Sequence, residues 1–169
     1  PGQVFEHPRG FTFTTSNMLN FARTFMQANP LYLNSQYARA HGFDDLPASA
    51  QMVFNVTLSL GVQNDSEKAI ANLGYYQVQF LRPVYPGDTL RAFTRVLERK
   101  DRGPDKPGIT RIRTVSVNQH DEVVLQYERK IMVGWRGARL PTTPAPDVAV
   151  AFPGEDTPLA GAPPANANW

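Results

Sequence analysis

The amino-acid sequence predicts an α+β domain in which an antiparallel sheet wraps around a central helix. Helical patterns dominate the chain before residue 63, and alternating strand patterns fill residues 69–133. The length of 169 residues suits one globular domain. Residues 137–169 hold seven of the fifteen prolines and only four charged residues, so we expect a body over 1–136 and a Pro/Ala-rich linker or tail over 137–169.

The first predicted elements are a short strand and two helices. Residues 10–14 predict the strand, because their two phenylalanines fall on one face. A helix follows from Ser16, a residue type that caps helices, to about Gln27. Pro30 prevents its continuation, since the residue before a proline avoids helical geometry. A shorter helix is expected over 35–40.

The next segment, residues 49–62, fits two structures. Its apolar residues alternate, as they would in a strand. It is also apolar almost all round and follows Pro47, with Ser49 in a capping position, which favours a buried helix. The pattern alone leaves both structures open.

Four strands complete the body, and the expected ranges are 69–84, 89–100, 109–118 and 123–133. A Pro-Gly-Asp turn joins the first two strands, and a polar turn joins the last two. One face of the last strand is apolar and the other carries polar residues, so we expect one buried and one wet face. The polar positions are Glu122, Gln126, Glu128 and Lys130.

The composition excludes several classes of function. A net charge of +2 is too small for wrapping nucleic acid or for firm attachment to an anionic membrane. The absence of cysteine excludes disulfides and thiolate metal sites. No apolar run approaches the roughly 18 residues that span a bilayer, and no leader opens the chain, so we expect a cytoplasmic protein.

The segment QANPLYLN, from Gln27 to Asn34, resembles the active-site segment of the MaoC-like hot-dog hydratases. The pattern of that family resembles G-D-x-N-P-x-H-x-D. Asn29 and the proline after it keep their places, whereas Gln27, Tyr32 and Asn34 stand where the family has Asp, His and Asp. An amide does not titrate and a phenol has a pKa of about 10, so neither Gln27 nor Tyr32 exchanges a proton readily at neutral pH.

Further segments narrow the resemblance. FLRPVYPGDTL resembles a strand-turn-strand signature of many hot-dog hydratases and thioesterases. AIANLGY, VYPGDTL and VNQHDEVVLQY look like the N-terminal half of the mesaconyl-CoA hydratase family, double hot-dog enzymes that act on branched dicarboxylic acyl-CoA thioesters. The resemblance covers about residues 4–136. It implies a hot-dog fold, a central helix over 49–62, one repeat of a double hot dog, and a tail that leads toward the second repeat.

Hydration of an enoyl thioester needs a base, an acid and donors that stabilise the enolate oxygen. The resemblance implies that a backbone N–H at the start of the central helix is one of these donors. Ser49 and Ala50 stand there in place of a His-Gly or similar pair, and the N–H of Ala50 can still donate. The Asp/His pair for proton transfer is what this chain lacks.

No catalytic residue is assigned, and the expected substrate-binding residues are Gln27, Asn29, Tyr32, Ser49, Ala50 and Tyr75. For Gln27 and Tyr32 a vestigial or substrate-shaping role is favoured over a catalytic one. Asn29 is expected to cap its own loop. Tyr75 and Tyr76 are expected to be core or interface aromatics, with lining of the acyl pocket as the alternative.

Arginines share one parity on each of two neighbouring strands. Arg91, Arg95 and Arg99 lie on the first strand, and Arg111 and Arg113 lie on the next. A hairpin brings the two groups together, and arginine suits bidentate contact with the phosphates of coenzyme A. We therefore consider Arg91, Arg95, Arg111 and Arg113 as phosphate-binding residues, with an exposed sheet face that only confers solubility as the alternative.

The three histidines are expected at the surface, because their spacing does not suit a metal site. His41 lies nearest to the QANPLYLN segment and is the candidate for a displaced base, whereas His7 and His120 have no assigned role. Asp44 and Asp45 are expected in a solvated turn. Their alternative role is that of the base or nucleophile of a hot-dog thioesterase.

The resulting hypothesis is a component of an acyl-CoA hydratase or dehydratase, a hydro-lyase in which this chain is the substrate-accommodating half. The expected partners are the acyl-CoA substrate and a second hot-dog repeat or homo-oligomer partner that pairs the hot dogs, with no nucleic acid and no membrane. No metal is expected, and no cofactor beyond the coenzyme A of the substrate. The alternatives are a non-catalytic acyl-CoA-binding or assembly module and a thioesterase.

Overall fold

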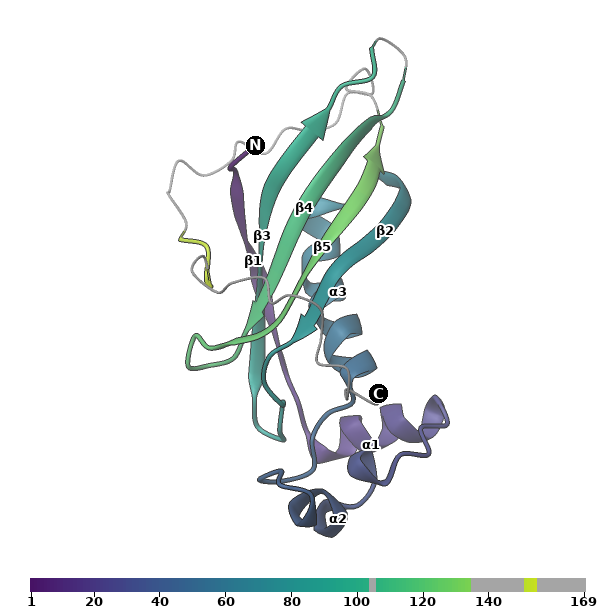
Figure 1. Ribbon diagram of the computed structural model, residues 1–169, viewed down its shortest axis with the longest axis vertical. Helices are drawn as coiled ribbons and strands as arrows, with labels where there is room; N and C mark the ends of the chain where they lie inside the picture. Colours follow the sequence, from purple (N-terminus) through teal and green to yellow (C-terminus); the bar gives the residue numbers. More distant parts are fainter. Residues whose placement is uncertain (104–105, 135–150, 155–169) are drawn as a thin grey trace.

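A computed structural model describes residues 1–103, 106–134 and 151–154 (Figure 1). Five antiparallel strands form one sheet in the order β1-β3-β4-β5-β2. The long helix α3 (Ala50–Asp65) lies across one face of this sheet, so the predicted α+β architecture is confirmed. The strands are β1 (Val4–Thr12), β2 (Ala69–Phe80), β3 (Thr89–Lys100), β4 (Gly108–Val117) and β5 (Val123–Val133).

The ambiguous segment is the helix α3, as the family resemblance implies. Ser49 is its N-cap, and its Oγ accepts a hydrogen bond from the N–H of Met52 at 3.3 Å. The helix packs mainly against β1 and β3, and its apolar side chains join the largest core cluster. The strand-like alternation arises because a helix that is buried nearly all round carries apolar residues at most positions.

Strand β1 is longer than predicted. It pairs with β3 on both sides of a register shift between Glu6 and Gly10. This irregularity interrupts the alternation of side chains. Pro8 lies within it, and a proline indicates the end of a strand when only the sequence is considered. The bounds predicted for β3 and β5 are confirmed, β4 differs by one residue, and β2 ends at Phe80 instead of residue 84.

The predicted cap of the first short helix is displaced by two residues, from Ser16 to Thr14. Helix α1 (Thr15–Thr24) is capped by Thr14, whose side chain forms a capping box with Asn17. It ends before Gln27, because Met26 has a left-handed φ of 51°. Helix α2 (Ser35–Ala40) is capped by Asn34, whose Oδ1 accepts hydrogen bonds from two backbone N–H groups.

The prediction of a wet face on β5 is wrong at Gln126 and Glu128, whereas Glu122 is exposed and Lys130 is half-buried. Gln126 has no exposed surface, and Glu128 is also buried. Arg113 donates to Gln126, Arg111 donates to Glu128, and Gln126 donates to Gln79 of β2 at 2.6 Å. Because β5 is an inner strand, its neighbours reach over it from both sides, and these cross-strand hydrogen bonds replace water.

Only residues 151–154 of the expected tail belong to the described part, and the rest of 137–169 lies outside it. Phe152 is buried against the sheet face that is opposite α3. Its neighbours are the apolar side chains of Phe93, Val115, Val117 and Val123. This short piece of the tail is therefore packed on the body.

Candidate functional site

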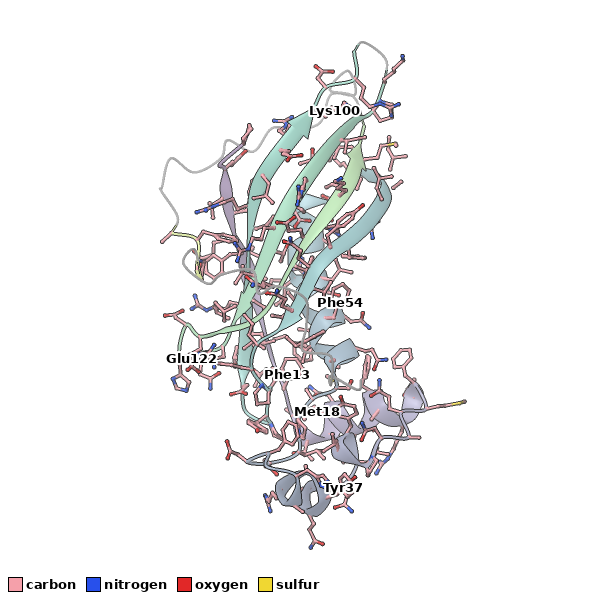
Figure 2. The ribbon with its side chains drawn as sticks, viewed as in Figure 1. Phe13, Met18, Tyr37, Phe54, Lys100 and Glu122 are labelled. Atoms are coloured by element: carbon pink, nitrogen blue, oxygen red, sulfur yellow. The ribbon has the colours of Figure 1, made fainter. Side chains whose placement is uncertain are left out.

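The segment that carries Gln27 and Tyr32 lies at the beginning of α3. Helix α1 ends just before it, the 3-10 helix η1 (Pro30–Tyr32) lies within it, and α2 follows. In Figure 2 the labels of Met18 on α1 and Tyr37 on α2 mark this region, at the end of the sheet opposite Lys100. The segment is therefore positioned by three short helices around one end of the central helix.

The side chain of Gln27 is bound to the first turn of α3. Its Nε2 donates a hydrogen bond to Oε1 of Gln51. Its Oε1 is buried and has no hydrogen-bond partner among the described residues. Gln51 is missing from the sequence-based site residues, because no local pattern links it to Gln27. The residue at the position of the family's aspartate, Gln27, thus carries an amide that is hydrogen-bonded to the amide of Gln51.

Tyr32 lies beside Ala50, at the start of α3. Burial of the phenol raises its pKa above the usual value, and a hydrogen bond with the backbone of Ala50 acts in the opposite direction. Because the net shift is upward, the phenol is neutral at physiological pH. Neither dyad position therefore carries a charge, and both contact the first turn of the central helix.

The other polar residues of the segment hold its backbone. Oδ1 of Asn29 accepts from the N–H of Leu31 at 3.0 Å and caps η1, so the predicted capping role is confirmed. Asn34, at the position of the family's second acid, caps α2. Ser49 is buried and caps α3. These three side chains fix the directions in which the helices leave the site.

Tyr75 belongs to an aromatic cluster beside the site. Its ring is 5.1 Å from that of Phe54 and 5.8 Å from that of Tyr127. Phe54 lies one helical turn after Ala50, so the cluster borders the beginning of α3. The expectation of a core aromatic is confirmed, since Tyr75 packs against the main core cluster.

The arginines lie on the face of the sheet that is opposite α3. Arg95 is directly opposite Arg113 in the register of β3 and β4, and both approach the ring of Phe152, at 4.6 and 5.8 Å. Arg91 forms ion pairs with Glu6 and Asp121. The structure therefore brings two arginines together but places the group away from Gln27 and Tyr32.

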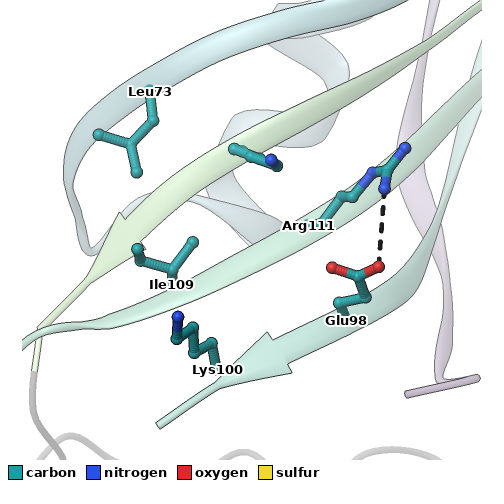
Figure 3. A pocket seen from close by; sticks show the side chains of 6 residues that line it. Leu73, Glu98, Lys100, Ile109 and Arg111 are labelled. Atoms are coloured by element: carbon teal, nitrogen blue, oxygen red, sulfur yellow. Dashed lines mark ion pairs between the residues drawn. The ribbon is translucent and has the colours of Figure 1, made fainter. Parts of the chain in front are cut away.

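Arg111 also lines a shallow pocket on this outer face (Figure 3). The pocket is lined by Leu73, Glu98, Lys100, Ile109, Arg111 and Lys130. Arg111 forms ion pairs with Glu98 at 3.6 Å, drawn in Figure 3, and with Glu128. Its charge is therefore already balanced by two carboxylates within the protein.

His7 is buried, so its predicted surface position is wrong. Its Nε2 lies 2.9 Å from Oγ1 of Thr94, which donates to Asp65 at 3.0 Å. Asp65 in turn forms a buried ion pair with Arg129 at 2.8 Å. Burial lowers the pKa of His7, Asp65 raises it, and Arg129 lowers it further. Gly61 is the one indirect signal in the sequence, because a Cβ there would lie 3.3 Å from Nε2 of His7.

This His7–Asp65 pair does not replace the missing dyad. Asp65 ends α3, and Ala50 begins it. A rise of ~1.5 Å per residue separates the two ends of the helix by about 22 Å. The buried imidazole and carboxylate are therefore far from Gln27 and Tyr32, and they connect α3 to the sheet.

The remaining candidates lie in exposed local structures. His41 ends α2, and its Nδ1 is 2.8 Å from the carbonyl oxygen of Tyr37, whose ring stacks on it. Asp45 forms an exposed ion pair with Arg39 at 3.0 Å, as expected of a solvated turn. In the described part of the chain, no three His, Asp or Glu side chains are grouped as metal ligands.

Comparison with known proteins decides the family. The family model described as mesaconyl-CoA hydratase matches residues 1–143. The chain belongs to the mesaconyl-CoA hydratase family. It is 34% identical to the β-methylmalyl-CoA dehydratase of Chloroflexus aurantiacus and 33% identical to the mesaconyl-CoA hydratase of Cereibacter sphaeroides, over 88% and 87% of its length.

Solved structures agree with this family. A MaoC domain protein dehydratase from Chloroflexus aurantiacus is 32% identical, with a TM-score of 0.77 over 93% of this chain and 44% of that one. A Mycobacterium tuberculosis protein described as a double hot-dog fold has a TM-score of 0.69 at 24% identity, over 88% of this chain and 50% of that one. The hot-dog fold implied by the sequence is therefore confirmed.

The chain spans less than half the length of the curated relatives that it matches, 42% and 43%. The match therefore covers only one part of each of these longer relatives. None of the helices described here has both the length and the apolar character needed to cross a bilayer.

Proposed function

We propose that this chain is the substrate-accommodating hot-dog half of an acyl-CoA hydratase or dehydratase of the mesaconyl-CoA hydratase type. The names of its relatives suggest a branched, dicarboxylic acyl-CoA as the substrate. The chain holds the thioester at the beginning of α3, and the groups that transfer protons belong to a second repeat. The observation that carries this proposal is that both dyad positions, Gln27 and Tyr32, are neutral and hydrogen-bonded to the first turn of α3.

The chemistry divides naturally between the two halves. Water adds to the β-carbon of the enoyl thioester after a base removes its proton, and an acid returns a proton to the α-carbon. Negative charge develops on the thioester oxygen in between. The N–H of Ala50, at the positive end of α3, bonds the hydroxyl of Tyr32 and is suited to stabilise the thioester oxygen when the substrate displaces that contact. Neutral Gln27 and Tyr32 are suited to orient the acyl group by hydrogen bonds.

The second repeat is proposed to pair with this one at β2. This strand is at the edge of the sheet and exposes large apolar side chains, which soluble proteins usually cover. The exposed residues on or just after β2 are Ile70, Leu73, Tyr76, Val78 and Leu81. Residues 137–169 are proposed as the linker toward that repeat.

Contact between the coenzyme A phosphates and Arg91, Arg95, Arg111 and Arg113 is proposed as a separate feature. Arg91 and Arg111 already bind carboxylates, and Phe152 covers the other two. Phosphate binding there requires these partners to move. It predicts that Arg95→Gln raises KM for the acyl-CoA but not for the matching acyl-pantetheine, which has no nucleotide phosphates.

The experiment is steady-state kinetics of the full-length protein, followed by the loss of the enoyl thioester. Tyr32→Phe and Gln27→Ala are compared with Tyr37→Phe and Gln36→Ala, exposed residues of α2 that serve as matched controls. We expect the two site variants to raise KM, with kcat changed by less than about tenfold. The proposal fails if either variant lowers kcat by the ~10²–10⁴ that loss of an acid or base causes.

A further inference from the structure

The two atoms at the end of the Gln27 side chain have different surroundings. Its Nε2 donates a hydrogen bond to Oε1 of Gln51, whereas its own Oε1 is buried and has no partner among the described residues. An amide oxygen accepts hydrogen bonds and cannot donate them. A buried acceptor without a donor is unfavourable, because it has given up its hydrogen bonds with water. A ligand that contacts Oε1 of Gln27 therefore binds best when it brings an O–H or N–H group.

The partner of Gln27 determines which end of its amide is left for a ligand. Gln51 is the second residue of α3, its side chain is exposed, and it offers its own oxygen to Nε2 of Gln27. The last torsion of a glutamine side chain has two broad, roughly equivalent orientations. If residue 51 offered a donor instead, the amide of Gln27 would turn over and present its N–H groups. Gln51 is therefore a positioning residue that acts through Gln27.

The chemistry of a hydro-lyase narrows the kind of donor. Such an enzyme interconverts an enoyl thioester and its hydrated form, in which the β-carbon carries a hydroxyl. The carbonyl oxygen of a thioester and the oxygens of a carboxylate only accept hydrogen bonds, and an alkene has no donor. Among the groups that these acyl chains carry, the hydroxyl is the one that can donate to Oε1 of Gln27.

We propose that Gln51 determines the specificity of the acyl site. By holding Nε2 of Gln27, it leaves Oε1 to accept a hydrogen bond from the hydroxyl of a β-hydroxyacyl-CoA. The pair thereby favours the hydrated thioester over one whose β-carbon carries a group that only accepts. This inference rests on the proposed function in that the ligand is an acyl-CoA, and it names the form of the acyl group that this chain binds more tightly.

Three coenzyme A thioesters of equal chain length test the preference. Butyryl-CoA has neither donor nor acceptor on carbon 3, 3-oxobutyryl-CoA has an acceptor only, and 3-hydroxybutyryl-CoA has both. Their inhibition constants are measured with the full-length protein from initial rates of hydration of but-2-enoyl-CoA. We expect the hydroxy thioester to bind about tenfold more tightly than the oxo thioester, because a site with a buried acceptor rejects a second acceptor.

A protein that does not hydrate but-2-enoyl-CoA can be tested by calorimetric titration instead. Such a protein does not dehydrate 3-hydroxybutyryl-CoA either, since both directions pass through the same transition state. Titration then supplies the same three constants without interference from turnover.

Two substitutions of Gln51 test its role in turning the amide. Gln51→Glu still only accepts from Nε2 of Gln27, so the ratio of the oxo and hydroxy constants should stay as in the wild type. Gln51→Lys only donates, so Gln27 should present its N–H groups, which serve a ketone and a hydroxyl alike. The ratio should then fall to within about twofold. The two thioesters carry the same charge, so the charge introduced at residue 51 cancels in the ratio.

Gln36→Glu and Gln36→Lys are the matched controls. Gln36 is the second residue of α2 and is exposed, as Gln51 is in α3. Both control variants should keep the wild-type ratio.

Several outcomes contradict the inference. Equal constants for the oxo and hydroxy thioesters in the wild type overturn it, and a preference for the oxo thioester would mean that Gln27 presents its N–H groups. A ratio that Gln51→Lys leaves unchanged also overturns it, because residue 51 would then not orient the amide. A protein that binds none of the three thioesters contradicts this inference, whatever it hydrates.

The outcomes also separate this inference from the proposed function. A protein that shows the expected ratios but hydrates no enoyl thioester contradicts the proposed function alone. An active hydratase without the preference for the hydroxy thioester contradicts the role of Gln51 alone.

Discussion

Ala50 offers its backbone N–H to the site, and proline at this position removes that group together with its hydrogen bond to Tyr32. Ala50 is the first residue of α3, where proline fits the helix and lacks only the N–H. Ser49 before it has φ −64° and ψ 144°, a conformation that a following proline tolerates. We therefore expect Ala50→Pro to fold normally.

The predicted effect of Ala50→Pro is on kcat. Loss of one donor to a developing oxyanion lowers kcat by ~10²–10³, and loss of the Tyr32 contact raises KM no more than Tyr32→Phe does. Thr15→Pro, at the first position of α1, is the control and should leave kcat unchanged. Rates for Ala50→Pro within a few-fold of the wild-type value would show that the thioester oxygen lies elsewhere.

At the residue scale, the sequence predicted local roles better than long-range ones. The capping by Asn29 and Ser49 follows from residue type and the next few residues, so it was predictable. His7 and Asp65 are 58 positions apart and meet only because β1 packs on the end of α3. Likewise Gln51 joins Gln27 through tertiary packing that no local pattern shows.

At the element scale, the piece of tail around Phe152 acts as a brace on the outer face of the sheet. Its ring lies on an apolar patch of β3 and β4 and against Arg95 and Arg113. Burial of the ring and the cation–π contacts both stabilise this arrangement. Burial also lowers the pKa of Arg113, although arginine stays protonated.

Phe152→Ala should lower the free energy of unfolding by about 3 kcal/mol, the lower end for a buried phenylalanine, because a short segment can partly relax. Phe152→Leu keeps most of the apolar contact and should lose only about 1 kcal/mol, chiefly from the cation–π contacts. Urea denaturation of both variants measures the difference. An unchanged midpoint for Phe152→Ala would mean that the brace does not contribute to stability.

The predictions of strand bounds and faces were wrong where pairing with neighbouring strands disturbs the alternation of buried and exposed side chains. Alternation correctly gave the bounds of β3 and β5, because regular pairing preserves the period of two. It failed at β1, where the irregularity at Pro8 breaks the period. It also misassigned the outer face of β5, because Gln126 and Glu128 are polar yet satisfied by other side chains.

At the scale of the whole molecule, the His7 cluster connects α3 to four strands. His7 on β1, Thr94 on β3, Asp65 on α3 and Arg129 on β5 form one buried group, with Thr114 of β4 bonded to Thr94. Because the pKa of His7 is lowered in the folded protein, the unfolded chain binds a proton first as the pH falls. The free energy of unfolding should therefore decrease below about pH 6.5, the ordinary histidine value.

The decrease in the free energy of unfolding has a defined limit, and a histidine variant serves as its control. It approaches ~1.4 kcal/mol per pH unit and ends below the lowered folded pKa of His7. His7→Gln keeps a hydrogen-bonding side chain but cannot titrate, so its unfolding midpoint in urea should depend less on pH in this range. His120→Gln, in the exposed β4–β5 turn, should retain the wild-type dependence. A wild-type pH dependence in His7→Gln would exclude this histidine as the cause.

The overall fold was predictable because two independent signals agreed. Composition and order of elements gave α+β, and the resemblance carried by QANPLYLN and VYPGDTL settled the central helix. The assembly of the site was not predictable, since it depends on how α1, η1 and α2 fold over the beginning of α3.

The unequal borders of the sheet limit how large an assembly can become. Along β1, Pro8 cannot donate a hydrogen bond and the register is broken, and among the described residues the large exposed apolar side chains of strands lie on β2. A domain with only one sheet edge that can pair forms a closed dimer and cannot extend into a filament. Concentrated solutions of such a molecule should hold closed pairs and no filaments.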